Sequence, residues 1–236
     1  MLTVRRAADR GKTDLGWLQS HHTFSFGGYQ DPNHTSFRSL RVLNDDRVAP
    51  GRGFGAHGHR DAEILSYVLS GALAHRDTTA DGHTVKENEL QAMTAGTGVI
   101  HSEFNASATE PVHFLQVWIL PAHEDLEPSC QHIAYAGDEK RGRLRVMAGS
   151  GDRIGDNAAA INQNAWMYAS VLAARDHVAH ELAAGRHAWV QCATGSLEVN
   201  GIRLDTGDGL AVSDVRTLTI TGRASGANEF LLFDLN

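Results

Sequence analysis

Two short motifs in the first half of the chain combine residue types that bind metal ions: His57-Gly58-His59 and His101-Ser102-Glu103. Side chains at positions i and i+2 of a β-strand project from one face, so each motif would present its two ligand side chains together. If the two strands are neighbours, three imidazoles and one carboxylate converge on one point. Imidazole binds Fe, Zn, Cu and Ni, and a carboxylate shifts the preference towards harder ions. The spacing therefore predicts a site for one divalent transition metal.

The fourth ligand stays open at this point, because two glutamates satisfy the strand parity. Glu103 shares a face with His101, and Glu63 has the same parity as His59, four residues further on. The chain has 14 histidines, so a single His-x-His pair has an ordinary alternative as a chance pair on a polar surface. Glycines that let strands turn and pack closely precede both motifs, and the joint pattern favours the metal site. Histidines without ligand spacing are interpreted as surface or hydrogen-bonded residues: His75, His83, His113, His123, His132, His177, His180 and His187.

Short strands are the elements that would position these residues. Helical periodicity is scarce, whereas runs of alternating or β-branched residues broken by Gly, Asn and Asp recur along the chain. Asn200-Gly201 is a hairpin signal, because both positions tolerate a positive φ. Many short strands with regular turns predict an all-β sandwich or barrel.

The two halves of the chain resemble each other in rhythm, with a strand, a glycine and a second strand around Gly71 and again around Gly195. We place the boundary between them in the polar stretch 122–143. Alignment of Gly195 with Gly71 puts Glu181, Ala183 and His187 at the positions of His57, His59 and Glu63. Alignment of Gly207 with Gly96 puts Val212 and Asp214 at the positions of His101 and Glu103. No imidazole pair survives there, so we expect one metal per chain, in the first half.

Composition narrows the function classes. The formal charge of 21 − 28 = −7 argues against a nucleic-acid partner bound through bulk positive charge. The two cysteines, Cys130 and Cys192, form no CxxC motif, which argues against a disulfide scaffold or a thiolate zinc site and suits a reducing compartment. The N-terminus has no apolar signal core, and no stretch is apolar over the length that spans a bilayer. We therefore expect a cytoplasmic protein that binds neither nucleic acid nor membrane.

The histidine motifs resemble those of the cupin superfamily. Its first motif, Gly-x5-His-x-His-x3-Glu followed by a glycine, is matched by Gly51, His57, His59, Glu63 and Gly71. The end of its second motif, Gly-x2-His-x3-Asn, is matched by Gly98, His101 and Asn105. Within the superfamily the chain resembles the pirins, and among them the bacterial pirin-like quercetinases, through segments spread over nearly its whole length: 16–18, 22–26, 40–46, 53–55, 93–98, 101–103 and 231–235. Gly58 departs from the proline that is usual in pirins, and His21 from the tryptophan that is often found.

The resemblance to the pirins implies an all-β bicupin, with two tandem β-barrel (jelly-roll) domains and few short helices. Residues 1–125 would form the N-terminal metal-binding cupin barrel. Residues 126–236 would form a C-terminal cupin barrel without metal ligands, whose strands could pair across the domains. Pirins use the acid two residues after the last histidine, so the implied ligands are His57, His59, His101 and Glu103. Glu63 would at most support a ligand imidazole.

The activity implied by the resemblance is that of quercetin 2,3-dioxygenase, which cleaves the heterocycle of a flavonol with O2 and releases CO. The metal would act as Lewis acid and template, with Fe(II) favoured and Zn, Ni, Co, Mn or Cu also compatible with the ligands. Glu103 is the candidate catalytic base. The alternative is a metal-dependent, redox-sensing regulator that acts through protein partners, with quercetinase activity incidental. Two barrels paired within one chain favour a monomer.

Several aromatic side chains are candidates for the wall around a flavonol or another small aromatic substrate. An ordinary place in the barrel core is an equally strong interpretation for each of them: Phe54, His22, Phe24, Phe26 and Phe104. Trp118 and Trp189 are expected in the core.

Overall fold

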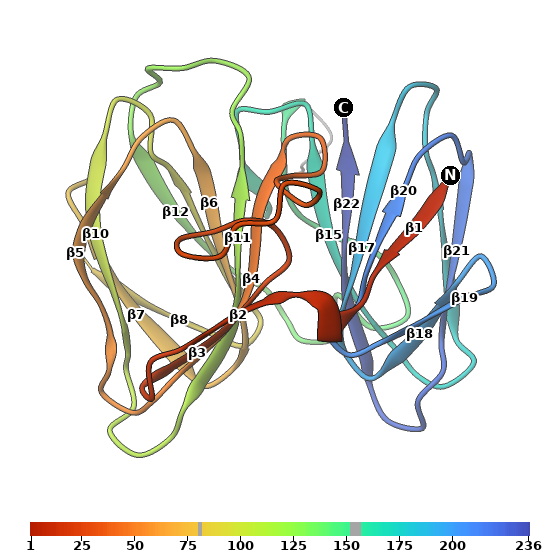
Figure 1. The fold of residues 1–236 in the computed structure, drawn as a ribbon, viewed down its shortest axis with the longest axis horizontal. Helices are drawn as coiled ribbons and strands as arrows, with labels where there is room; N and C mark the ends of the chain where they lie inside the picture. The colour runs from red at the N-terminus through yellow and green to blue at the C-terminus, as the bar shows by residue number, and fades with distance from the viewer. Residues whose placement is uncertain (80–81, 152–156) are drawn as a thin grey trace.

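The computed structural model describes residues 1–79, 82–151 and 157–236, and over these ranges the chain is almost entirely β-structure (Figure 1). Within them, 22 strands are joined by turns, and helical structure is confined to short 3-10 segments such as η1 (Ala7–Asp9). The all-β prediction is confirmed. None of the helical structure in these ranges is long and apolar enough to cross a membrane.

The first half of the molecule contains a seven-stranded sheet and a four-stranded sheet. The larger sheet has the order β12 (Ser129–Ala134), β9 (Glu89–Thr94), β6 (Glu63–Ser70), β11 (Val112–Ile119), β4 (Leu40–Val48), β3 (Leu18–His22) and β2 (Gly11–Asp14). The smaller sheet has the order β5 (Gly53–His59), β10 (Val99–Asn105), β7 (Ala72–Asp77) and β8 (His83–Lys86).

The second half repeats this arrangement with a seven-stranded and a four-stranded sheet. The larger sheet has the order β1 (Leu2–Arg5), β20 (Gly209–Val212), β17 (His187–Thr194), β22 (Asn228–Leu235), β15 (Trp166–Leu172), β13 (Arg145–Gly149) and β14 (Ala159–Ala160). The smaller sheet has the order β16 (His177–Glu181), β21 (Thr217–Gly222), β18 (Ser196–Val199) and β19 (Ile202–Asp205). Position by position, β16 and β21 correspond to β5 and β10.

The chain exchanges one edge strand in each direction between the two halves. β1, at the N-terminus, pairs with β20 of the second half, and Figure 1 shows it lying among the blue strands. β12, which follows residue 125, pairs with β9 of the first half. The division into 1–125 and 126–236 stays a prediction, but hydrogen-bonded sheets cross it on both sides.

The prediction of closed β-barrels is wrong, because the strands of each half form two separate, open sheets that are not joined by hydrogen bonds into a barrel. The chain changes sheets through turns that interrupt the ladder. One such turn joins β5 of the smaller sheet to β6 of the larger one, and Asp61 within it has a left-handed φ of 49°. Two packed sheets of this kind still enclose a core, as in double-sheet jelly rolls.

Local turn chemistry agrees with the sequence. Asn200 and Gly201 have φ values of 46° and 83° and connect β18 to β19, as the hairpin signal predicted. Gly71 and Gly195, which suggested a repeat, both have a φ of 80° at equivalent turns. One large apolar cluster includes residues of both halves, among them Phe24, Tyr67 and Phe233, so the halves share a core.

Candidate metal centre

Strands β5 and β10 bring the three predicted histidines together. They pair antiparallel, with His57 directly opposite His101 and His59 opposite Val99. One ring nitrogen from each of His57, His59 and His101 lies within 4.8 Å of the others. The condition on which the prediction rested, that the two motifs lie on neighbouring strands, is therefore met.

The distance between two of these rings fits a shared ion. Nε2 of His57 and Nε2 of His101 are 3.0 Å apart. Two imidazoles bound at about 2.0–2.1 Å and roughly a right angle would place their nitrogens about 3 Å apart. The residues present therefore fit a transition metal held by three imidazoles.

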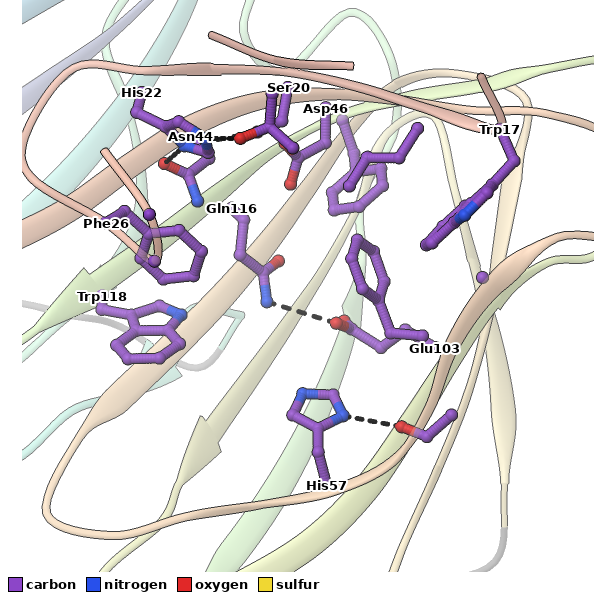
Figure 2. A pocket seen from close by; sticks show the side chains of 18 of the residues that line it. Trp17, Ser20, His22, Phe26, Asn44, Asp46, His57, Glu103, Gln116 and Trp118 are labelled. Atoms are coloured by element: carbon purple, nitrogen blue, oxygen red, sulfur yellow. Dashed lines mark hydrogen bonds between the residues drawn. The ribbon is translucent and has the colours of Figure 1, made fainter. Parts of the chain in front are cut away.

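Hydrogen bonding and burial prepare the rings for a cation. The Nδ1–H of His57 donates to the carbonyl of Gly55 at 2.7 Å, which leaves the Nε2 lone pair free for a metal (Figure 2). Burial, and then the neighbouring charge of His57, lower the pKa of His59 to about 4. Burial, followed by the charges of the neighbouring histidines, lowers the pKa of His101 to about 3. Both rings therefore stay neutral, as metal-binding imidazoles must be, down to a pH well below 7.

A close backbone approach at Gly53 sets the register of this strand pair. A Cβ at this position would lie 2.2 Å from the carbonyl oxygen of Glu103 and 2.5 Å from Cα of Phe104. The register shifts between His101 and Glu103, so that Glu103 pairs with Phe54. A glycine at position 53 is what allows β5 to follow β10 through this irregularity.

Glu103 is buried on the cavity side of β10 and is held by neutral donors. The hydroxyl of Ser66 donates to its Oε1 at 3.1 Å. Nε2 of Gln116 donates to its Oε2 at 3.4 Å, as Figure 2 shows. Burial raises the pKa of Glu103 to about 7, against the opposing effect of these two hydrogen bonds. Among the described residues, the tight group within 4.8 Å contains the three histidines and not this carboxylate. Its role as fourth ligand stays a prediction.

The prediction that Glu63 shares a strand face with His57 and His59 is wrong, because the chain changes sheets between them. Glu63 starts β6 in the larger sheet, whereas His57 and His59 lie on β5 in the smaller one, so they share no strand face. The Glu63 carboxylate accepts hydrogen bonds from Thr94 at 2.8 Å and from Asn162 at 3.0 Å. Neither partner is a predicted ligand.

His57 and His59 open onto a cavity of about 550 Å³ with mainly apolar walls, in which aromatic side chains are prominent. Of the predicted wall residues, His22, Phe26 and Phe54 line it, whereas Phe24 packs in the core against Trp189. The last candidate, Phe104, is 41% exposed and is not part of the lining. Three further aromatic lining residues were not among the predicted wall residues: Trp17, Phe114 and Trp118.

Trp118 corrects an expectation in part, because it is half-buried: it packs against a core cluster that includes Ile64 and Met93, and it also lines the cavity. The centroid of its ring lies 4.8 Å from that of His59 and 5.5 Å from that of Phe26, and both pairs are edge-to-face. Figure 2 shows Trp118 and Phe26 on one side of the cavity and Trp17 on the other. The prediction for Trp189 is confirmed, since this residue is buried.

The far side of the cavity from the histidines carries polar groups. The Nδ1 atom of His22 bonds the side-chain oxygen of Asn44 at 2.9 Å, next to Ser20 (Figure 2). Burial, and then the charges of Asp45 and Glu103, raise the pKa of Asp46 to about 7, although Ser20 opposes the shift. One Asp46 oxygen is buried without a hydrogen-bond partner. A ligand in this cavity would meet aromatic faces and a few placed polar groups, as in small-molecule sites generally.

The second half holds other residues where the first half has its histidines. β21 occupies the place of β10, and its first residue, Thr217, pairs with Glu181, just as Val99 pairs with His59. The alignment from Gly195 was wrong by two residues, because the strand pairing makes Glu181 the counterpart of His59 and not of His57. The alignment from Gly207 was also wrong, because Val212 lies on β20, in the larger sheet. Within the described ranges, both groups of three or more ligand side chains lie in the first half or on its strand β12.

Comparison with known proteins gives the same picture over the full length. The family model "Pirin" matches residues 3–119, and "Quercetinase C-terminal cupin domain" matches residues 149–235. The chain is 39% identical over 235 residues to a quercetin 2,3-dioxygenase of Escherichia coli, covering 100% of this chain and 99% of that protein.

Solved structures agree with this relationship. The crystal structure of the Escherichia coli protein YhhW matches with a TM-score of 0.93 at 38% identity, covering 100% of this chain and 98% of that one. The nickel(II) complex of the same bacterial pirin matches with a TM-score of 0.92 at 39% identity, covering 100% and 99%. On its sequence, its fold and its histidine-bearing strands, the chain belongs to the pirin family of the cupins.

Proposed function

We propose that this protein is a metal-dependent quercetin 2,3-dioxygenase, which cleaves the heterocycle of a flavonol with O2 and releases carbon monoxide. The observation that carries the proposal is the common focus of His57, His59 and His101, two of which, His57 and His59, line a cavity of about 550 Å³ together with aromatic side chains. The name of the Escherichia coli relative supports it. We also propose that the two sheet pairs are the jelly rolls of a bicupin, and that the protein is monomeric and cytoplasmic.

The proposed metal ligands are His57, His59, His101 and, as the fourth, Glu103. We propose Fe(II) as the ion, while the bacterial pirin YhhW shows that a member of this family accepts nickel(II). A bound metal would supply Lewis acidity that makes a coordinated substrate hydroxyl easier to deprotonate.

Glu103 is the residue of this chain suited to receive the flavonol 3-hydroxyl proton. Its pKa of about 7 makes the carboxylate available at neutral pH while keeping it basic enough to hold a proton. Ser66 and Gln116 fix its two oxygens, so the carboxylate is oriented before substrate binds. The charge that Glu103 gains on ionisation lies in a buried site, where its interactions with the substrate are strong.

The walls of the cavity suit a flat, polyhydroxylated ring system. Two edge-to-face pairs, Trp17 with Phe54 at 5.4 Å and Phe26 with Trp118 at 5.5 Å, offer apolar surface to the substrate rings. The polar groups at His22 and Asp46 can bind ring hydroxyls. Together these residues orient the substrate and exclude water from it.

The test is reconstitution of the metal-free protein with Fe(II), Mn(II), Ni(II), Co(II), Cu(II) or Zn(II), followed by flavonol absorbance, O2 uptake and CO release. We expect turnover with one CO released per O2 consumed. Absence of turnover with every metal would contradict the enzyme proposal and leave the regulatory hypothesis. Turnover without CO would contradict the ring-cleavage chemistry alone.

A further inference from the structure

A second group of ligand side chains lies beside the predicted metal centre. His75 on β7, His83 on β8 and Cys130 on β12 each bring one ligand atom within 4.8 Å of the others. His75 and His83 are direct partners across two strands of the smaller sheet, with ring centroids 5.2 Å apart. Because β12 is an edge strand of the larger sheet, the group joins both sheets of the first half.

Two ring nitrogens of this group, one on each histidine, are buried and lack a hydrogen-bond partner. His75 is 1% exposed, and neither its Nδ1 nor Nε2 of His83 has a hydrogen-bond partner. The carboxylate of Asp77, whose side chain is also 1% exposed, lies 3.4 Å from Nδ1 of His75. Buried polar atoms nearly always have a hydrogen-bond partner. Two imidazole nitrogens without one, next to a thiol and a carboxylate, therefore indicate a place where a cation binds.

The donor types indicate which cation. Two imidazoles, a thiolate and a carboxylate oxygen suit a four-coordinate, borderline-soft ion such as Zn(II). Burial, and then the charge of Asp77, raise the pKa of the Cys130 thiol to about 12, so the thiol keeps its proton in the absence of a cation. On binding, the S–H bond breaks, the proton leaves to solvent, and its electron pair forms the metal–sulfur bond.

One hydrogen bond connects this group to the first centre. Nε2 of His75 lies 3.0 Å from Nδ1 of His101, whose Nε2 lies 3.0 Å from Nε2 of His57. Two neutral imidazoles carry two protons on four nitrogens, and one of these protons lies in their shared hydrogen bond. If His101 donates it, Nε2 of His101 has a lone pair for the first centre, and Nδ1 of His75 is protonated. If His75 donates it, the lone pair faces the second group instead, and Nε2 of His101 is protonated.

We propose that His75, His83 and Cys130, with the carboxylate of Asp77 beside His75 as a further donor, form a second site for a borderline-soft divalent cation such as Zn(II), and that its occupation opposes metal binding at the first centre. Filling both sites would leave a single proton on two imidazoles, one of which would have to be an imidazolate. The sequence pattern had indicated one metal per chain, with His75 and His83 as surface or hydrogen-bonded residues. This inference goes beyond the proposed function, and only its coupling rests on His101 as a ligand of the first centre.

Cobalt absorption tests the second site in the full-length, metal-free protein. The first centre has no sulfur ligand, so a thiolate-to-cobalt charge-transfer band in the near ultraviolet reports the second site alone. We expect this band in the wild type and in the control Cys192→Ala, and its loss in both Cys130→Ala and His83→Gln. A band that persists in Cys130→Ala, or no band in the wild type at saturating Co(II), would overturn the proposal.

Competition with Mn(II) tests the coupling, because a thiolate site disfavours this hard ion. Filling the first centre with Mn(II), monitored by electron paramagnetic resonance, should weaken Co(II) binding at the thiolate site roughly tenfold. In His57→Ala, which lacks a ligand of the first centre, Mn(II) should leave the Co(II) affinity unchanged. An unchanged Co(II) affinity in Mn(II)-loaded wild type would refute the coupling. None of these measurements depends on flavonol turnover, so their failure is distinguishable from a failure of the proposed catalytic activity.

Discussion

The two halves of this molecule share one strand order and differ in what they present from it. In the first half, β5 and β10 bring three imidazoles together, and the two on β5 line a cavity with aromatic side chains in its wall. In the second half, β16 and β21 occupy the same places in the sheet with Glu181 and Thr217 at matching register positions. A cavity of about 710 Å³ in the second half is lined by charged residues, among them Arg186 and Asp234, which are themselves hydrogen-bonded.

This difference shows that the backbone positions a site but does not create it. The same sheet order can hold ligands or leave them out, because substitutions on one face of two strands hardly affect the ladder or the core behind it. What the second half retains is the apolar core, which includes Val190, Leu218 and Ile220. We expect changes at matched positions to have unequal effects on function.

The largest effect should come from His59→Ala. Loss of one imidazole should abolish stoichiometric metal binding at the first centre and lower kcat/KM for a flavonol at least about a thousandfold, since the metal contributes several kcal/mol of transition-state stabilisation. Metal analysis and steady-state kinetics measure both. The matched control is Glu181→Ala, at the corresponding position of β16, which should change neither. Equal losses in the two variants would show that the halves are functionally equivalent.

Glu103→Gln should have the next largest effect, because it removes the proposed base while keeping the shape of the side chain. We expect kcat to fall about 10²–10⁴-fold. In the wild type, the raised pKa of about 7 means that, below this pH, a metal must displace a proton from Glu103. Metal binding to the wild type should therefore release one more proton than binding to Glu103→Gln at pH 6, as measured by calorimetry in buffers of different ionisation enthalpy. Equal proton release would contradict the role of Glu103 as a ligand.

Glu103 should also make the metal-free protein less stable as the pH rises. Because the folded pKa of Glu103 lies above its unfolded value, the stability associated with its protonated form is present at low pH and is lost as the pH rises through about 7. The metal-free Glu103→Gln variant, which stays neutral, should therefore melt at a higher temperature than the metal-free wild type at pH 8. The two melting temperatures should converge near pH 4.

The smallest of these effects should come from Gly53→Ala, which tests how the first half positions its ligands. A Cβ at residue 53 would collide with the backbone of Glu103 and Phe104, so we expect a loss of about 1–3 kcal/mol in unfolding free energy, together with weaker metal binding. Gly55→Ala, on the same strand and with open space around its Cβ position, should change neither. Denaturant titration and metal affinity measure the pair, and a similar loss in Gly55→Ala would refute the close-approach argument.

Local sequence periodicity was enough to identify the three histidines. The ligands of each motif lie two residues apart, and a β-strand places such residues on one face whatever the rest of the fold does. The Asn200-Gly201 turn was predictable for the same reason, because the backbone conformation of a tight turn depends on its own residues. The resemblance to the pirins supplied the family and its cupin fold, which the comparisons bear out.

The tertiary structure decided everything that depends on which distant strands face each other. Glu63 does not share a strand face with His57 and His59, because a turn of three residues takes the chain from the smaller sheet to the larger one. Trp118 became a wall of the cavity, and Cys130 came to lie beside His75 and His83, because strands of opposite sheets enclose them. No local period records such contacts, since they arise only when segments tens of residues apart in the chain pack around one core.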